Sequence, residues 1–300
     1  MSSLLASSVL LIRPAAFGFN TDTAGSNFFQ QSHTSNHPQD LALKEFDALV
    51  ETLKQHQINV QIFNDDIAPL KPDAVFPNNW FSTHAGGKIV LYAMEAPSRR
   101  AEITREHISA LQAMGYELTL DLREEVSRQH FLEGTGSLVF DHVQQTVVAV
   151  HSSRTHPQLA GRVATHLGYL LLMLHAADAN AQTVYHTNVV MSIAPSLAIV
   201  CYDAINDEEE RKQLQILLAI PGRNIIEVSK AQLHAFCCNA LVVNNEQNKK
   251  CIVLSETAWH AFTPRQRSTI ASEAIPVVVS IPTIEKVGGG SARCMLAELF

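Results

Sequence analysis

The sequence predicts an α/β protein built from repeated modules that pack around an axis. Predicted strands and helices alternate along the whole chain, and a unit of two strands, one helix and a further strand recurs about five times. The repeat is roughly 55 residues long, a period typical of modules that bury their apolar faces against their neighbours. A doubly wound sheet is the weaker alternative, because no G-x-G-x-x-G follows the first strand.

The first module opens with a buried strand over Ser8–Ile12. The polar segment Asn20–Asp40 is then expected to be a long loop, of the kind that forms a lid or a site wall. A helix is predicted over Asp40–Gln55, because its apolar residues recur at helical spacing, and a strand is predicted over Asn59–Phe63.

Later modules repeat the same pattern of apolar runs bounded by turn residues. The expected strands are Asp73–Phe81, Lys88–Met94, Glu117–Leu122, Ser137–Phe140, Thr146–Val150, Val189–Ile193, Leu197–Tyr202, Asn224–Val228, Ala240–Asn244, Cys251–Ser255 and Val277–Ile281. The expected helices are Arg100–Met114, Pro157–Leu167, Asp207–Leu218 and Pro264–Ser272. No stretch has the composition of a long linker, so we expect a single catalytic domain over residues 1–300.

Composition excludes several classes of function. A net charge of −7 argues against a dedicated nucleic-acid binder, although local arginines can still bind a small anionic or zwitterionic substrate. The apolar stretch Leu167–Ala177 is too short to span a bilayer, and the short apolar start Met1–Ile12 lacks the basic residues of a signal peptide. Five cysteines without regular spacing indicate a reducing, cytoplasmic compartment. No pattern encodes the oligomeric state, so a homo-oligomer stays open.

Two segments near strand ends carry candidate nucleophile and acid–base residues. Cys294 follows Gly288–Gly290, which let the backbone approach a ligand closely, and the charge of the adjacent Arg293 would favour a thiolate. His186 stands just before an apolar strand, where it would face a cleft. The alternative for Cys294 is a buried structural cysteine. The alternative for His186, one of fourteen histidines, is a surface or core residue without a catalytic role.

Other polar residues interrupt apolar or glycine-rich stretches. Glu133 precedes a G-x-G turn, where a solvated glutamate is the alternative. Asn78 and Asn79 need hydrogen-bond partners if they are buried; an asparagine-capped turn is the alternative. Arg99, Arg100 and Arg154 are candidates for anion binding, although most arginines are merely solvated, and Asn239 beside the core-like Cys237-Cys238 pair is a further cleft candidate.

Taken together, four ordered runs resemble the guanidino-group-modifying superfamily. They are F-P-N-N-W-F-S-T-H, F-L-E-G-T-G-S, Y-H-T-N-V and G-G-G-S-A-R-C-M-L-A-E, and they look most like the citrulline-utilisation hydrolase branch. The resemblance covers essentially the whole chain. It implies the pentein fold, a five-bladed α/β propeller, together with a small amino-acid substrate and no metal or organic cofactor.

The resemblance also implies a role for each candidate residue. Cys294 matches the nucleophile, His186 the general acid and base, and Glu133 the carboxylate that holds the substrate nitrogens and orients the site. Arg154 matches a residue that binds the substrate carboxylate, and the second such residue is either Arg99 or Arg100. Asn79, with Asn78 beside it, falls where relatives hold the head group.

Asn79 and Asn188 depart from the deiminase pattern, which commonly has aspartates at both positions. A carboxylate about 4 Å from a guanidinium contributes roughly 4 kcal/mol at an effective dielectric constant near 20, before desolvation. An amide both donates and accepts hydrogen bonds, so it suits a neutral ureido group better than a cation. The sequence therefore favours conversion of citrulline to ornithine, ammonia and carbon dioxide.

Several alternatives stay open or are disfavoured. An arginine deiminase, a dimethylarginine dimethylaminohydrolase and an amidinotransferase would all use the same residues. A non-catalytic pentein that binds the large ribosomal subunit would not need aligned Cys, His and Glu residues. A metal enzyme is disfavoured because neither H-E-x-x-H nor a paired C-x-x-C occurs.

Overall fold

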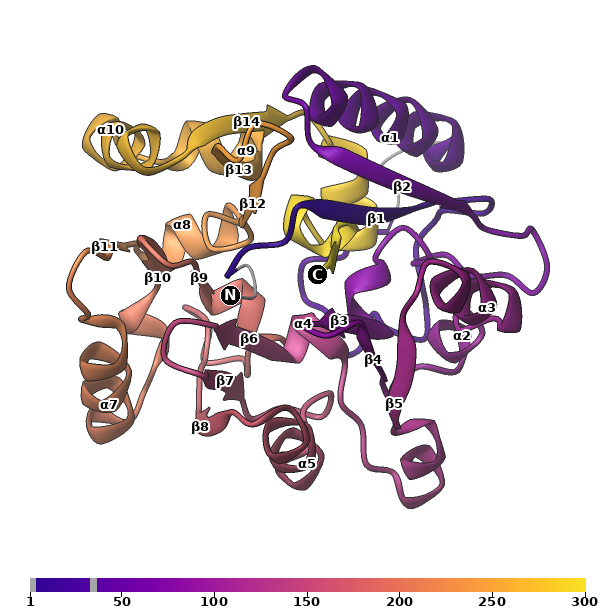
Figure 1. Ribbon diagram of the computed structural model, residues 1–300, viewed down its shortest axis with the longest axis horizontal. Coiled ribbons are helices and arrows are strands. Elements are labelled where there is room, and N and C mark those ends of the chain that lie inside the picture. Colours follow the sequence, from indigo (N-terminus) through magenta and orange to yellow (C-terminus); the bar gives the residue numbers. More distant parts are fainter. Residues whose placement is uncertain (1–3, 33–36) are drawn as a thin grey trace.

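The computed structural model describes residues 4–32 and 37–300, and its strands form five three-stranded sheets. Figure 1 shows these sheets arranged around a common centre, with the longer helices at the periphery. The predicted fold class is thereby confirmed, and each sheet is one blade of the propeller. Residues 1–3 of the predicted N-terminal stretch and 33–36 of the predicted loop lie outside the described residues.

Every sheet combines an antiparallel pair with a third, parallel strand. In four of the sheets the antiparallel pair is a hairpin, and a helical crossover leads from it to the parallel strand. Four sheets contain β3 (Phe81–His84), β4 (Lys88–Leu91) and β5 (Glu117–Asp121); β6 (Leu138–Asp141), β7 (Thr146–Val150) and β8 (Leu170–Leu174); β9 (Met191–Ile193), β10 (Leu197–Val200) and β11 (Asn224–Glu227); and β12 (Leu241–Asn244), β13 (Lys250–Ser255) and β14 (Ile275–Val279).

The fifth sheet joins the two ends of the chain. It consists of β15 (Ala297–Leu299), β1 (Ser8–Arg13) and β2 (Asn59–Asn64), with β15 antiparallel to β1 and β2 parallel to it. This pairing closes the ring of blades, and it carries the residues that precede β15 to the centre.

Crossover helices and short turns complete the blades. The helices are α1 (Pro38–Gln55), α2 (Pro97–Arg100), α3 (Arg105–Ala113), α4 (Gly134–Ser137), α5 (Pro157–Leu167), α6 (Thr187–Val190), α7 (Glu208–Leu218), α8 (Lys230–His234), α9 (Glu256–Ala261) and α10 (Pro264–Glu273), with 3₁₀ turns η1 (Pro77–Asn79), η2 (Arg123–Arg128), η3 (Tyr202–Ala204) and η5 (Ala292–Met295) and a π turn η4 (Ile284–Gly288). Among the described residues, no helix combines the length and the apolar character needed to cross a membrane.

Two predicted elements were wrong in ways that matter for the centre. Residues 73–80 of the predicted strand Asp73–Phe81 form turns and η1, because Pro77 fixes its backbone angle and has no N–H to donate to a sheet. The predicted helix Arg100–Met114 is split into α2 and α3, since the Thr104 side chain caps the start of α3 by accepting a hydrogen bond from the His107 amide.

Smaller differences concern short elements. The first two residues of the predicted strand Val189–Ile193 belong to the one-turn helix α6. The strand β8 was not predicted, because its run of leucines lacks the alternation of a half-buried strand. The helices α8 and α9 were also missed, since five or six residues show too little periodicity to predict a helix.

Five short segments precede the strands that face the centre. We call them the axial segments: residues 76–80 before β3, 133–137 before β6, 186–190 before β9, 236–240 before β12 and 292–296 before β15. The turns within them pack together, with η1 against α4 and η5, and α4 against α6. Side chains that are far apart in the sequence therefore converge at the axis of the propeller.

Candidate active site

A cavity of about 270 Å³ lies where the axial segments meet the loop between β1 and α1. It is lined by Asn27, Asp73, Phe76, Asn79, Arg99, Arg154, Tyr185, His186, Gly288, Gly289, Gly290 and Cys294. This volume includes space open to solvent, and the lining combines charged, amide and aromatic side chains with glycines.

The glycines before Cys294 allow close packing on one side of the cavity. A Cβ atom on Gly288 or Gly290 would lie 2.8 Å from the ring of Phe76, which rests against their backbone. Gly289 has a φ of +66°, and the Asn27 amide donates to its carbonyl oxygen at 3.3 Å. The loop between β1 and α1 is thus a wall of the cavity, as its polar composition predicted.

His186 and Glu133 form a buried pair beside the cavity. Nε2 of His186 lies 2.9 Å from Oε2 of Glu133. Burial lowers the pKa of His186 to about 4, although the hydrogen bond with Glu133 opposes this shift. Burial alone would raise the pKa of Glu133, but Arg154, His186 and Arg99 hold it well below its usual range. At neutral pH the imidazole is therefore uncharged and the carboxylate ionised.

Gly136 leaves room for this pair, and its replacement tests that claim. A Cβ atom at Gly136 would lie 2.4 Å from Asn79 Nδ2 and 2.7 Å from His186 Nδ1. We expect Gly136→Ala to displace both side chains and to lower kcat/KM by about 10²-fold. The control is Gly161→Ala in α5, where no atom lies within 4 Å of the added methyl group. That variant should keep full activity and gain about 1 kcal/mol of stability in thermal unfolding; equal activity of both variants would contradict the prediction.

Arg154 approaches the cavity from the loop between β7 and α5. Its Nη1 lies 3.4 Å from Glu133 Oε2, its Nη2 donates to Ser26 Oγ at 2.7 Å, and its guanidinium sits 4.8 Å from the centre of the Tyr185 ring. The cation is thus held by a carboxylate, a hydroxyl and an aromatic face. One side of it faces the cavity.

Of the two adjacent arginines, the structure brings Arg99 rather than Arg100 to the cavity. Arg99 forms a buried two-bond ion pair with Glu102, and its Nη1 donates to Asn79 Oδ1 at 2.8 Å. Arg100 instead donates to the backbone carbonyl oxygens of Met94 and Glu95, so it does not line the cavity.

The two asparagines of η1 differ in position. Asn79 lines the cavity, and its Oδ1 is occupied by Arg99 while its Nδ2 is buried and makes no hydrogen bond within the described residues. Asn78 is fully buried behind it and does not line the cavity. Because Arg99 fixes the orientation of the amide, the group of Asn79 that is left without a partner among the described residues is a donor.

The Cys294 sulfur is contacted by two amides. Asn239 Nδ2 lies 3.3 Å from Sγ and Asn188 Nδ2 lies 3.6 Å from it. Glu133 and Asn188 do not line the cavity themselves. They contact the residues that do, Glu133 through His186 and Arg154, and Asn188 through Cys294.

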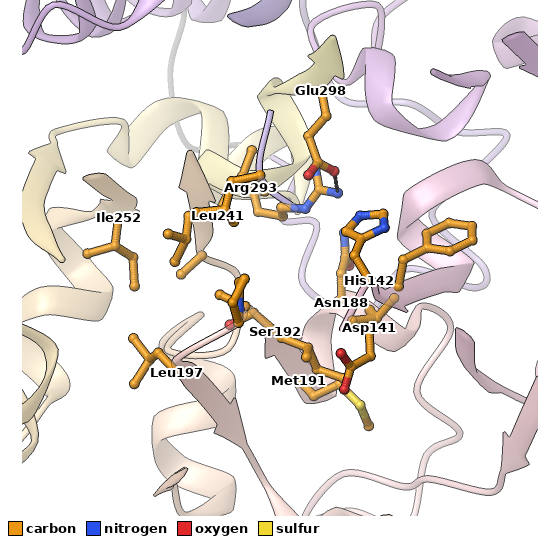
Figure 2. Close-up of a pocket in the computed structure, with 18 of the residues that line it drawn as sticks. Asp141, His142, Asn188, Met191, Ser192, Leu197, Leu241, Ile252, Arg293 and Glu298 are labelled. Atoms are coloured by element: carbon orange, nitrogen blue, oxygen red, sulfur yellow. Dashed lines mark hydrogen bonds and ion pairs between the residues drawn. The ribbon is translucent and has the colours of Figure 1, made fainter. Parts of the chain in front are cut away.

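The expectation that Arg293 faces the sulfur was wrong. Figure 2 shows its side chain in a second pocket, which shares no lining residue with the cavity. There it donates to Glu298 Oε2 and to the Leu296 carbonyl oxygen, each at 2.8 Å. Consecutive residues of a 3₁₀ turn point about 120° apart, which is why neighbouring side chains reach different pockets. Asn188 also lines this second pocket, so its side chain lies between the pocket and the sulfur.

Sequence reasoning missed Asp73, the one carboxylate among the described residues that lines the cavity. Its Oδ2 accepts hydrogen bonds from Asn20 and Thr23, and its buried Oδ1 makes none among residues 4–32 and 37–300. Burial raises its pKa, against the opposing charge of Arg99. A lone aspartate in an apolar stretch was the available signal, but the stretch was predicted to be a strand.

Comparisons with known proteins agree with this fold. Residues 13–300 match the family model described as N,N dimethylarginine dimethylhydrolase, eukaryotic, whereas the search of curated proteins returned no match. ArgZ, an arginine dihydrolase from the ornithine–ammonia cycle in cyanobacteria, superposes with a TM-score of 0.76 at 18% identity, over 97% of this chain and 40% of that one. Unliganded AgrE superposes with a TM-score of 0.77 at 19% identity, over 98% of this chain and 39% of that one.

A dimethylarginine dimethylaminohydrolase structure has a TM-score of 0.66 at 16% identity and covers 98% of this chain and 100% of its own. The chain thus spans about two fifths of ArgZ and AgrE but the full length of this third structure. These structural likenesses confirm the pentein fold. The family match over residues 13–300 shows that the chain belongs to the N,N dimethylarginine dimethylhydrolases, hydrolases of the guanidino-group-modifying superfamily that its ordered motifs resemble.

Proposed function

We propose that this protein is a cysteine-dependent hydrolase of the ureido C–N bonds of citrulline, and that residues 1–300 form one catalytic domain. The observation that carries the choice of substrate is the orientation of Asn79. Its Oδ1 accepts from Arg99 at 2.8 Å, whereas its Nδ2 has no partner among residues 4–32 and 37–300 and is the amide atom that still needs one. A guanidinium offers donors alone, whereas a ureido group has a carbonyl oxygen that this N–H can bind.

The charges at the cavity fit the amino-acid end of the substrate. Arg154 supplies a cation for the α-carboxylate, and Arg99 adds positive charge nearby. Asp73 has a buried carboxylate oxygen without a hydrogen bond in the described part of the chain, which suits the α-ammonium group. The cavity thus carries both signs of charge beside a neutral, hydrogen-bonding head-group position.

The proposed chemistry needs only side chains and water. The Cys294 thiol passes its proton to the neutral imidazole of His186, and the sulfur forms a bond to the ureido carbon. His186 returns the proton to the leaving nitrogen as its C–N bond breaks, while Glu133 keeps the ring oriented. Water then attacks the S-bound carbon with His186 as base, and the C–S bond breaks to return the thiol. The carbamic acid that is released decomposes to carbon dioxide and the second amine. Citrulline and one water give ornithine, ammonia and carbon dioxide.

The pH dependence of the reaction follows from the buried imidazole. The proposed base must be neutral, and burial lowers the pKa of His186 to about 4. We therefore expect kcat/KM to fall only as the pH drops through about 4, and not near the ordinary histidine value of about 6.5. An acid limb near 6.5 would contradict this role. In Glu133→Gln, which loses an interaction that raises this pKa, the limb should move to still lower pH.

Product identification tests the proposed substrate. Purified protein would be incubated with L-citrulline, L-arginine, methylated arginines and succinylarginine, and amino-acid products would be identified by mass spectrometry. We expect ornithine from citrulline. Citrulline as a product of arginine would overturn the argument from Asn79, and turnover of none of these compounds would overturn the proposed function.

The variant Asn79→Asp tests the same argument from the protein side. A carboxylate can accept hydrogen bonds from Arg99 and from a guanidinium at once. We expect kcat/KM for citrulline to fall by about tenfold, the size of one neutral hydrogen bond, while the preference shifts toward arginine, whose charged group makes a hydrogen bond worth about 1.5–3 kcal/mol. Unchanged preference would count against a head-group contact at this residue.

A further inference from the structure

The axial segment before β12 contributes a single polar side chain to the centre, that of Asn239. The other four axial segments contribute Asn79, Glu133, His186 with Asn188, and Cys294. In residues 236–240 the neighbours of Asn239 are Phe236, Cys237, Cys238 and Ala240, which are buried in the core. Asn239 is 1% exposed. Burying its amide among apolar residues costs free energy, because the amide loses its hydrogen bonds to water.

The partner of this buried amide is the nucleophile. Asn239 Nδ2 lies 3.3 Å from Cys294 Sγ, closer than the 3.6 Å of Asn188 Nδ2. Nδ2 also lies 3.4 Å from the Asn188 carbonyl oxygen. One N–H of Asn239 is thus held by the backbone and the other points at the sulfur, while the neutral thiol can itself donate to Asn239 Oδ1 at 3.6 Å.

Neither the adjacent Arg293 nor His186 donates a hydrogen bond to Sγ among the described residues. Arg293 pairs with Glu298 in the second pocket, and His186 Nε2 is bonded to Glu133. Within residues 4–32 and 37–300, the hydrogen bonds donated to Sγ come from Asn239 and Asn188. Hydrogen bonds to an ionised acceptor are about twice as strong as those between neutral groups.

We infer that Asn239 is a catalytic residue whose amide donates a hydrogen bond to the Cys294 thiolate and stabilises it before attack. The inference rests on the proposed role of Cys294 as the nucleophile. When the thiol gives its proton to His186, the negative charge left on sulfur is met by the Asn239 N–H. An aspartate at this position would instead place a second negative charge beside the sulfur.

The test measures the sulfur directly and needs no substrate. The rate at which iodoacetamide alkylates Cys294 would be followed across pH, with the modified peptide identified by mass spectrometry. In Asn239→Ala the pH midpoint of alkylation should rise by about one to two units, the size expected for one hydrogen bond to a charged group. At a pH below the midpoint this corresponds to an alkylation rate at least about tenfold lower.

Two further variants make the result interpretable. Asn239→Asp keeps the shape of the side chain and should raise the midpoint at least as far as Asn239→Ala. Cys238→Ala changes a buried neighbour that does not contact Sγ and should leave the midpoint unchanged. Thermal unfolding would confirm that each variant is folded.

The outcomes separate this inference from the proposed function. An unchanged midpoint in a folded Asn239→Asp or Asn239→Ala protein would overturn the role of Asn239, whatever the substrate. A raised midpoint supports that role even where the product assay rejects citrulline, because alkylation reports the state of the sulfur alone.

Discussion

Replacement of Cys294 by serine is expected to abolish turnover while citrulline binding is retained. The hydroxyl oxygen occupies nearly the same space as the sulfur in a residue that is only 7% exposed, so the cavity should keep its shape. An alcohol is far less acidic and less nucleophilic than a thiol, and removal of a nucleophile costs on the order of 10⁴–10⁶ in rate. Turnover would be measured by ornithine release, and binding by titration calorimetry.

The matched control for this loss is another buried cysteine. Cys251 in β13 is also free and buried, but it packs in the core and does not line the cavity. Cys251→Ala should lose stability and keep its rate per folded molecule. Turnover by Cys294→Ser within about tenfold of the unmodified protein would contradict the assignment of the nucleophile.

Glu133→Gln is expected to lower kcat by about 10²–10⁴-fold, with a smaller effect on KM. In the structure Glu133 Oε2 receives hydrogen bonds from both His186 and Arg154. A glutamine keeps the shape but removes the charge, so the imidazole loses the anion that orients it and stabilises it after it takes a proton. Loss of one partner in a buried ion pair also costs about 3–5 kcal/mol of stability.

Glu125→Gln provides a comparison at an exposed ion pair. Glu125 pairs with Arg128 and Arg162 on the surface, where solvent and salt screen such pairs. Both kcat and the unfolding temperature of this variant should stay close to those of the unmodified protein. A kcat of Glu133→Gln equally close to the original would show that the carboxylate does not act in the reaction.

Much of the site could be predicted because its residues are polar side chains in apolar or glycine-rich segments just before strands. Cys294, His186, Asn79 and Arg154 all line the cavity, as their placement at strand ends suggested. Their convergence follows from the repeat, because each module brings the same part of its fold to the axis.

The remaining features depend on the direction of individual side chains. Arg99 and Arg100 are equivalent in the sequence, and only the path of α2 decides which one lines the cavity. Arg293 is next to Cys294 along the chain but lines a different pocket. Adjacency in sequence therefore does not establish an electrostatic contact.

Fold prediction was limited in a similar way. Local periodicity indicated most helices and strands, but the pairing of β15 with β1 joins residues almost a whole chain apart and leaves no local signal. The turn at Pro77 interrupts a run that otherwise has the composition of a strand. Asp73 and Asn79, which line the cavity, owe their positions to that interruption.

The central claim is that the Cys294 sulfur bonds to the ureido carbon of citrulline. The most direct test uses citrulline labelled with ¹³C at that carbon, with acid quenching during turnover and mass spectrometry of the peptide that carries Cys294. The account predicts the label on this cysteine, and the added mass identifies which nitrogen leaves first. Steady release of ornithine with no label on Cys294, and with undiminished release by Cys294→Ser, would contradict it.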